Sequence, residues 1–329
     1  MINRVAMFKS GGMALLCALP LFAGIMMAFP AAGAFVHADA GVLAVYYEEE
    51  LSEYEPRALS GRTVILDAGH GVDRDNTFMG YSESRAMIRV ARELAELLEE
   101  HGARVILTRR GYMDVPLPVR AARMNQIAME TLREAYLEGI YIATDKQEVD
   151  ELIDLLQRII DDYENYAPVY FNFPFDWTFE RRVHPEMMRV FQLQAHPLIA
   201  ENFLMISLHS NAVPNPSRSN AHGVDVYIMT RFIGEDRHYF ADYSHEERNR
   251  FFGEILIDNI DALGIERRGV HGGNWFIVRE HNLPGALVEN GFHTSNHDRA
   301  LLMCNDFLSK LAVAYEDAIL RYFRYFNEE

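Results

Sequence analysis

The chain has 329 residues, a formal net charge of −17 at neutral pH and only two cysteines. An acidic surface of this kind disfavours nucleic acid as a partner, and two cysteines far apart in the sequence exclude a cysteine-based zinc site. The length suits one large domain, or one domain with an inserted subdomain, behind a leader.

Residues 1–40 are expected to be a signal peptide or an N-terminal membrane anchor. The run 10–36 carries no formal charge and follows two basic residues, as in export signals. Small residues at 32–34 and 38–40 favour cleavage, whereas the length of the run also allows an uncleaved anchor through residues 10–36. We therefore expect an exported protein of the periplasm or cell envelope, with residues 41–60 as a lead-in segment.

Beyond residue 60, apolar periodicity predicts alternating strands and helices. The predicted order is strand 63–66, helix 84–101, strand 104–108, helix 117–131, an insertion of about 130–202, strand 203–208, strand 223–229, helix 244–262, strand 275–278, strand 285–289 and helix 298–323. This alternation predicts a three-layer α/β/α domain, residues 61–329, with a mostly parallel central sheet.

The insertion at about 130–202 is predicted to be helical and rich in aromatic residues. A capping box at 144–147 and apolar residues at helical spacing predict an amphipathic helix near 145–162. Eight aromatic residues then fall between Tyr163 and Phe179. Either this strip packs the helix against the main domain as a satellite core, or the insertion borders a substrate groove and regulates access to it.

Four side chains that can carry chemistry lie near the ends of predicted elements. His70 and His209 each follow a strand, Glu289 ends a strand, and Glu83 lies in the first turn of a helix. Because ligands of open α/β sheets usually bind at the carboxyl ends of strands, we expect these residues to share one cleft.

Two neutral imidazoles and one carboxylate form a ligand set that leaves one zinc coordination position open for water. Zinc lowers the pKa of bound water toward neutrality and polarises a carbonyl, as amide hydrolysis requires. The remaining carboxylate, Glu289, would accept the proton of the water and pass it to the leaving nitrogen. The pattern thus suits a zinc hydrolase.

Simpler interpretations exist for several of these residues. The helix dipole favours Glu83 in a first turn without any metal, and Glu289 could be a salt-bridged carboxylate at a strand end. Arg109 and Arg120 are expected to serve packing or ion pairing near the sheet.

Other histidines are weaker candidates for a metal site. His293 and His297 have helical i, i+4 spacing but lack the glutamate of the His-Glu-x-x-His signature, so we expect them on a turn. His271 and His281 flank a glycine-rich, apolar stretch and are candidates for lining a groove.

Five segments of the chain occur in a recognisable order: Val64–Gly71, Leu107–Arg109, Ile206–Ala212, Gly223–Tyr227 and Leu287–Phe292. They resemble the N-acetylmuramoyl-L-alanine amidases of the zinc-dependent amidase-3 family, and the resemblance covers residues 62–128 and 202–323. It implies that His70, Glu83 and His209 bind Zn²⁺ and that Glu289 is the catalytic carboxylate. The implied reaction cleaves the amide between the lactyl group of muramic acid and L-alanine in peptidoglycan.

Two other function classes stay open at this point. One is a zinc peptidase or carboxypeptidase acting on cell-wall peptides, and the other is a non-catalytic wall-binding regulator. Some cell-division amidases of the resembled family are held inactive by an inserted helix until a partner displaces it. This motivates the hypothesis of a protein activator that acts on the insertion 130–202, in an enzyme of cell-wall remodelling or daughter-cell separation.

Overall fold

A computed structural model describes residues 57–142, 144–172, 183–230, 240, 242–243 and 245–326. The expected leader, residues 1–40, lies outside these residues, and so does most of the lead-in segment 41–60. Within the described ranges, no helix has the length and apolar character needed to cross a bilayer.

The centre of the domain is a six-stranded sheet with the strand order β4-β1-β5-β8-β6-β7. Its strands are β1 (Thr63–Ala68), β4 (Arg104–Leu107), β5 (Phe203–Asn211), β6 (Val224–Ile228), β7 (Arg267–Gly272) and β8 (Gly285–Phe292). All neighbouring strands run parallel except β6 and β8, which are antiparallel. A short hairpin of β2 (Thr77–Phe78) and β3 (Tyr81–Ser82) lies apart from this sheet.

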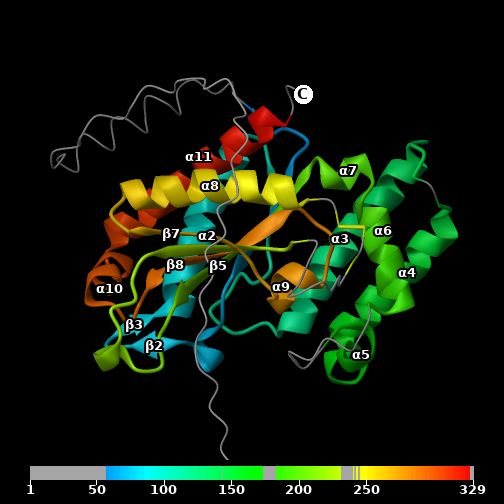
Figure 1. Ribbon diagram of the computed structural model, residues 1–329. Helices are drawn as coiled ribbons and strands as arrows, with labels where there is room; N and C mark the ends of the chain where they lie inside the picture. Colours follow the sequence, from blue (N-terminus) through cyan, green and yellow to red (C-terminus); the bar gives the residue numbers. More distant parts are fainter. Residues whose placement is uncertain are drawn as a thin grey trace, which may run out of the picture. The chain divides into compact units, whose positions relative to one another are not determined.

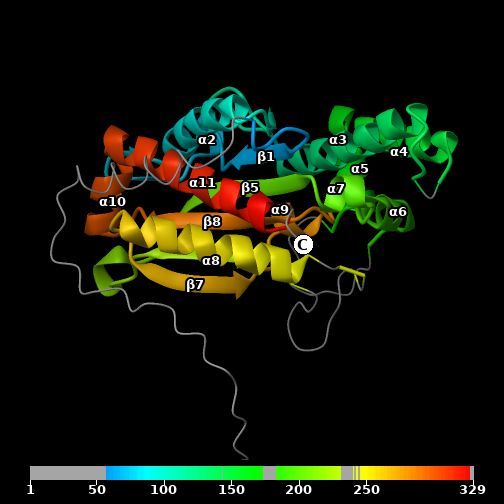
Figure 2. The same ribbon diagram turned by 90° about the horizontal axis from the view of Figure 1, so that it is seen from above.

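Helices cover both faces of the sheet (Figures 1 and 2). One face packs against α2 (Glu83–Glu100), α8 (Glu246–Ala262) and α11 (Asn305–Tyr325). The other face packs against α3 (Leu117–Leu137) and α9 (Phe276–Arg279). Alternate residues of a strand enter the two cores, because successive side chains of a strand point to opposite faces. The predicted three-layer α/β fold is therefore confirmed.

The insertion contains the predicted amphipathic helix as α4 (Lys146–Asp161), which begins where the side chain of Asp145 accepts a hydrogen bond from the backbone N–H of Glu148. The helices α5 (Tyr163–Tyr170), α6 (Pro185–Gln194) and α7 (Pro197–Ala200) follow. The buried face of α4 packs on α3 and joins the core on that side of the sheet.

The described part of the aromatic strip also belongs to this core. Phe171 is buried against Phe276, with ring centroids 5.7 Å apart, and the preceding tyrosines are partly buried against the same cluster. The described residues thus fit the satellite-core interpretation. The four remaining aromatics lie outside the described residues: Phe173, Phe175, Trp177 and Phe179.

Two features of the second half differ from the sequence prediction. The predicted strand 275–278 is wrong: the segment is a single turn of helix, α9, and its apolar side chains are buried. A run of four apolar residues is too short for its length to distinguish a strand from a helix. The strand β7 was not predicted, because it lies at the sheet edge and its mostly exposed residues lack apolar alternation.

The predicted final helix 298–323 is also interrupted. It consists of α10 (Asn296–Leu302) and α11, and the chain turns at Met303 and Cys304, where Cys304 has extended backbone angles. The α11 segment still buries its apolar face as its periodicity indicates.

Candidate metal centre

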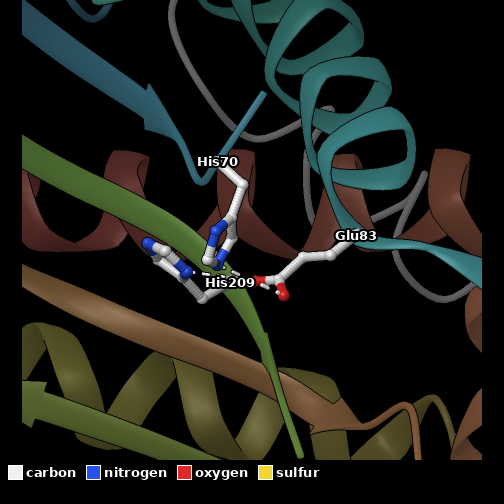
Figure 3. A group of neighbouring side chains, drawn as sticks. All are labelled: His70, Glu83 and His209. Carbon is white, nitrogen blue, oxygen red and sulfur yellow. Dashed lines mark hydrogen bonds and ion pairs between the residues drawn. The ribbon is translucent and has the colours of Figure 1, made fainter. Parts of the chain in front are cut away.

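Three predicted site residues from distant parts of the chain meet at one end of the sheet (Figure 3). His70 lies in the turn after β1, Glu83 is the first residue of α2, and His209 lies near the end of β5. One potential ligand atom from each side chain lies within 4.8 Å of the other two. Among the described residues, this is the group of histidines and acids that could hold a metal ion.

The turn that carries His70 is shaped by close contacts. A Cβ on Gly69 would lie 2.5 Å from Cε1 of His209, so a side chain there would displace the imidazole. His70 itself has φ of +55°, in the left-handed region that non-glycine residues rarely adopt. Strained backbone of this kind persists at functional sites where surrounding contacts enforce it.

Arg109 supplies some of those contacts. Its Nε donates to the carbonyl of Ala68 at 2.8 Å, and its Nη2 donates to the carbonyls of Gly69 at 2.9 Å and Ser84 at 2.8 Å. Burial lowers the pKa of Arg109 to about 10, so the guanidinium is still charged at neutral pH. This buried cation therefore ties the His70 turn to the first turn of α2, which carries Glu83.

Arg120 holds the same turn from α3. Its Nη2 donates to the carbonyl of His70 at 2.8 Å and to Asp114 at 2.7 Å, while its Nη1 contacts Asp67 at 3.1 Å. Asp67 also accepts a hydrogen bond from Ser207 on β5 at 2.7 Å. Arg120 forms ion pairs, as expected, whereas Arg109 donates to backbone carbonyls, and together the two arginines fix the backbone of the site.

Glu83 is almost fully buried, with 1% of its side chain exposed. Its Oε1 accepts hydrogen bonds from the backbone N–H of Ser210 at 2.9 Å and from Nδ1 of His209 at 3.0 Å. Its Oε2 lies 3.4 Å from Nε2 of His70 and makes no hydrogen bond. Although burial opposes ionisation, the two imidazoles hold the pKa of Glu83 well below its ordinary value, so the carboxylate is charged.

Glu289 lies beside this group on the neighbouring strand. It is paired in register with His209 on β5 and with Asp225 on β6. Its Oε2 is buried and has no hydrogen-bond partner among the described residues. Burial raises the pKa of Glu289 to about 7, although the positive charge of a protonated His209 would oppose this rise. A carboxyl group that titrates near neutral pH is well matched to proton transfer.

Both strands extend beyond their predicted ends, so His209 lies inside β5 and does not follow it, and Glu289 lies inside β8 and does not end it. Sequence reasoning also missed a polar layer behind Glu83. The Oγ atom of Ser210 lies 2.9 Å from the hydroxyl of Tyr81 and 3.0 Å from Nδ1 of the buried His293. No sequence motif marks these contacts, which arise only when β3, β5 and β8 come together.

The other candidate histidines have different surroundings. His293 lies in the turn after β8 and His297 is exposed on α10, so they do not form a helical pair. His281 is buried, and its Nε2 donates to the carbonyl of Ile277 at 2.8 Å, which excludes it from a groove. His271 is about half exposed on β7.

The inserted helix α4 contributes no carboxylate to the three-residue group. Its Glu148 binds Arg189 of α6, and its Asp150 pairs with Lys146. The insertion rejoins the sheet through α7, which leads into the beginning of β5, whereas His209 lies near the other end of that strand.

Comparisons with known proteins match this chain to N-acetylmuramoyl-L-alanine amidases. The family model described as N-acetylmuramoyl-L-alanine amidase matches residues 64–132 and 190–321, more than half of the chain. The germination-specific N-acetylmuramoyl-L-alanine amidase of Bacillus subtilis (strain 168) is 23% identical over 267 residues, which cover 80% of this chain and 81% of that protein.

Solved structures of similar fold include the N-acetylmuramoyl-L-alanine amidase AmiC2 of Nostoc punctiforme, with 18% identity and a TM-score of 0.48. Another is the catalytic domain of the amidase CwlV from Bacillus (Paenibacillus) polymyxa var. colistinus, with 16% identity and a TM-score of 0.47. Each match covers 80% of this chain and 98% of the other. By its match to the family model, the chain belongs to the amidase-3 family of N-acetylmuramoyl-L-alanine amidases.

Proposed function

We propose that this protein is a zinc-dependent N-acetylmuramoyl-L-alanine amidase. It hydrolyses the amide between the lactyl group of muramic acid and L-alanine in peptidoglycan. The observation that carries this proposal is the convergence of His70, Glu83 and His209 next to Glu289, whose buried Oε2 makes no hydrogen bond among the described residues.

The donor set fits a zinc ion. Two imidazole nitrogens and a carboxylate are the ligands that catalytic zinc sites use, with one position left for water or substrate. Glu83 is charged and keeps one buried oxygen without a hydrogen bond, an arrangement that a cation would compensate. His70, Glu83 and His209 would therefore hold the metal.

A bound zinc ion would lower the pKa of water toward neutrality and polarise the carbonyl of the scissile amide. Glu289 is the group that moves the proton: its carboxylate accepts a proton from the attacking water and then donates it to the nitrogen of the leaving L-alanine. The backbone N–H of Ser210 orients Glu83, and the arginine contacts with the His70 turn keep His70 in place.

Product analysis tests the reaction. Purified peptidoglycan should release intact stem peptides that begin with L-alanine, with the glycan strands left uncut, as measured by mass spectrometry. We expect Glu289→Ala to retain zinc and to lose about a hundredfold to ten-thousandfold in turnover, because only the proton-transfer group is removed. Cleavage inside the stem peptide would identify a peptidase instead, and near-normal turnover of the variant would show that Glu289 is not the base.

We propose further that the chain is exported to the periplasm or cell envelope and acts there in cell-wall remodelling or daughter-cell separation. Fractionation of cells that produce the tagged full chain tests this proposal. Tagged protein found only in the cytoplasm would contradict it.

A protein activator that acts on the insertion 130–202 is part of the same proposal. Deletion of residues 140–195 should raise the basal activity if the insertion restrains the enzyme. Because α4 covers apolar side chains of α3, folding of the deletion variant must be checked by its melting curve. Unchanged or lower activity in a folded variant would contradict autoinhibition.

A further inference from the structure

Three aromatic rings form a cluster at the edge of the sheet, next to the proposed catalytic carboxylate. We call Tyr227 of β6, His271 of β7 and Trp275, which precedes α9, the aromatic platform. The ring centroid of Tyr227 lies 5.6 Å from that of His271 and 5.6 Å from that of Trp275. Trp275 is 38% exposed and the side chain of His271 is 46% exposed, so solvent reaches the rings.

The backbone makes room for these rings. A Cβ on Gly273 would lie 2.8 Å from Cδ1 of Trp275 and 2.9 Å from Cβ of Tyr227, so only glycine allows Trp275 to close on Tyr227. A Cβ on Gly269 would similarly lie 3.0 Å from Cε1 of His271. The close fit at two glycines indicates that the platform is a defined arrangement of side chains.

Strand pairing places the platform beside the reaction site. In the antiparallel pair of β6 and β8, Asp225 is opposite Glu289 and Tyr227 is opposite Leu287. Directly opposed side chains lie on the same face of a sheet, and residues two apart on one strand share that face. Tyr227 is therefore one diagonal neighbour away from Glu289, on the same face.

The carboxylate of Asp225, beside the platform, is already paired. Asp225 accepts hydrogen bonds from Nε of Arg268 at 2.7 Å and from Nε2 of His271 at 2.9 Å. The Arg268 guanidinium and the Nε2 atom of His271 are therefore engaged with Asp225, and the platform presents mainly ring surface. Such a surface suits the apolar face of a sugar ring better than the carboxylates of a stem peptide.

We propose that the aromatic platform binds a sugar ring of the glycan strand, on the muramic acid side of the scissile amide. This inference rests on the proposed amidase function, because that substrate joins a glycan to a peptide. The indole of Trp275 stacks on the sugar; the ring of Tyr227, at 76° to it, supports the indole from the side, while Asp225 fixes the orientation of the His271 imidazole through its hydrogen bond.

Glycan binding can be measured without any hydrolysis. The probe is a tetrasaccharide of alternating N-acetylglucosamine and N-acetylmuramic acid that lacks stem peptides, titrated calorimetrically into the full chain. We expect Trp275→Ala to weaken binding roughly fivefold to tenfold, which is the scale of one aromatic contact. Trp275→Phe keeps a ring and should stay within about twofold of the wild type.

Tyr141→Ala serves as the matched control, because Tyr141 is an 83% exposed aromatic residue beyond the end of α3. Its affinity for the tetrasaccharide should equal that of the wild type, and equal melting temperatures would show that all variants fold. Wild-type affinity in Trp275→Ala would overturn the proposal. A free stem peptide that binds through Trp275, without binding of the tetrasaccharide, would overturn it too.

Failure of this inference can be told apart from failure of the proposed function. Suppose that the protein hydrolyses peptidoglycan and that Trp275→Ala binds the tetrasaccharide as tightly as the wild type does. That result would refute the sugar-binding role of the aromatic platform and leave the amidase function standing. Tetrasaccharide binding that depends on Trp275, in a chain that cleaves no lactyl–alanine amide, would support the platform as a glycan site and refute the amidase.

Discussion

At the scale of single residues, the candidate site depends on backbone geometry as much as on the four side chains proposed to carry the chemistry. His70 is held with positive φ, and Gly69 allows the ring of His209 to approach the turn. The sequence motif around His70 contains Gly69, but the motif alone does not show that the backbone needs a positive φ at His70 or room for the His209 ring.

Gly69→Ala should therefore damage the proposed metal centre without removing any proposed ligand. The new Cβ would overlap the His209 ring, and we expect the affinity for zinc to fall about tenfold to a hundredfold, as when outer-shell contacts of metal ligands are lost. Competition with a chromogenic chelator measures this affinity. Gly111→Ala is the control, because a Cβ there would meet nothing within 4 Å; equal zinc affinities in the two variants would contradict the account.

Arg109→Lys tests the buried guanidinium that joins the His70 turn to α2. Lysine cannot reach the carbonyls of Gly69, Ser84 and Ala68 together, so we expect unfolding to become easier by about 2–4 kcal/mol. Urea denaturation measures the change. The neighbouring Arg110→Lys is exposed and should stay within about 0.5 kcal/mol of the wild type; a loss as large as that of Arg109→Lys would refute the specific role of Arg109.

Much of the site could be predicted because it depends on residue identity next to strongly periodic elements. The ligand candidates lie at or near the ends of elements with clear apolar patterns, and the fold brings them together. The contacts of Tyr81, Ser210 and His293, and the pairing of Asp225 with Glu289, depend on how strands register with one another. Single-strand patterns carry no information about that register.

At the scale of elements, the helices and strands that could be predicted from the sequence are those that are long and have a clear amphipathic period. The helices α2 and α4 have strong apolar stripes and were predicted almost to their ends. The edge strand β7 lacks apolar alternation and the single turn α9 is too short to show a period, so tertiary contacts determine their conformation.

A buried polar network joins the insertion to the main domain. Nε2 of Gln194, at the end of α6, donates to Asn125 of α3 at 2.7 Å, and its Oε1 accepts from the backbone N–H of Asn282 at 2.7 Å. Asn125 in turn donates to the carbonyl of Glu280 at 2.8 Å. The end of α6 is thus connected both to α3 and to the segment that leads into β8.

Gln194→Leu should therefore destabilise the whole domain and not only the insertion. The variant leaves buried partners on Asn125 and Asn282 unsatisfied, which costs about 2–4 kcal/mol. Chemical denaturation should still show one transition, at a lower midpoint. Gln192→Leu, on the exposed side of α6, is the control; a separate early transition in Gln194→Leu would show that the insertion unfolds independently.

At the scale of the whole molecule, buried histidines make stability depend on pH. Nε2 of His281 donates to the carbonyl of Ile277, and its Nδ1 accepts from the backbone N–H of Leu283 at 3.0 Å, so the fold requires a neutral ring. Burial lowers the pKa of His281 to about 4, and burial lowers that of His245 to about 4 as well.

The sign of the effect follows from these values. An unfolded histidine titrates near pH 6.5, so the contribution of His281 to stability is complete above that pH and is lost as the pH falls toward 4. The loss should be on the order of 2–3 kcal/mol for this residue. Urea unfolding of the wild type and His281→Gln between pH 7 and pH 4 should give converging stabilities, whereas the exposed His297→Gln should follow the wild type. Parallel curves for the wild type and His281→Gln would contradict this assignment.

The proposed activity depends on one cation bound between the two imidazoles and Glu83. Crystals of the full chain grown with one equivalent of zinc, with diffraction data collected at the zinc absorption edge, test this directly. We predict one anomalous peak, in contact with His70, Glu83 and His209 and adjacent to Glu289. A peak elsewhere in the molecule, or none, would contradict the account.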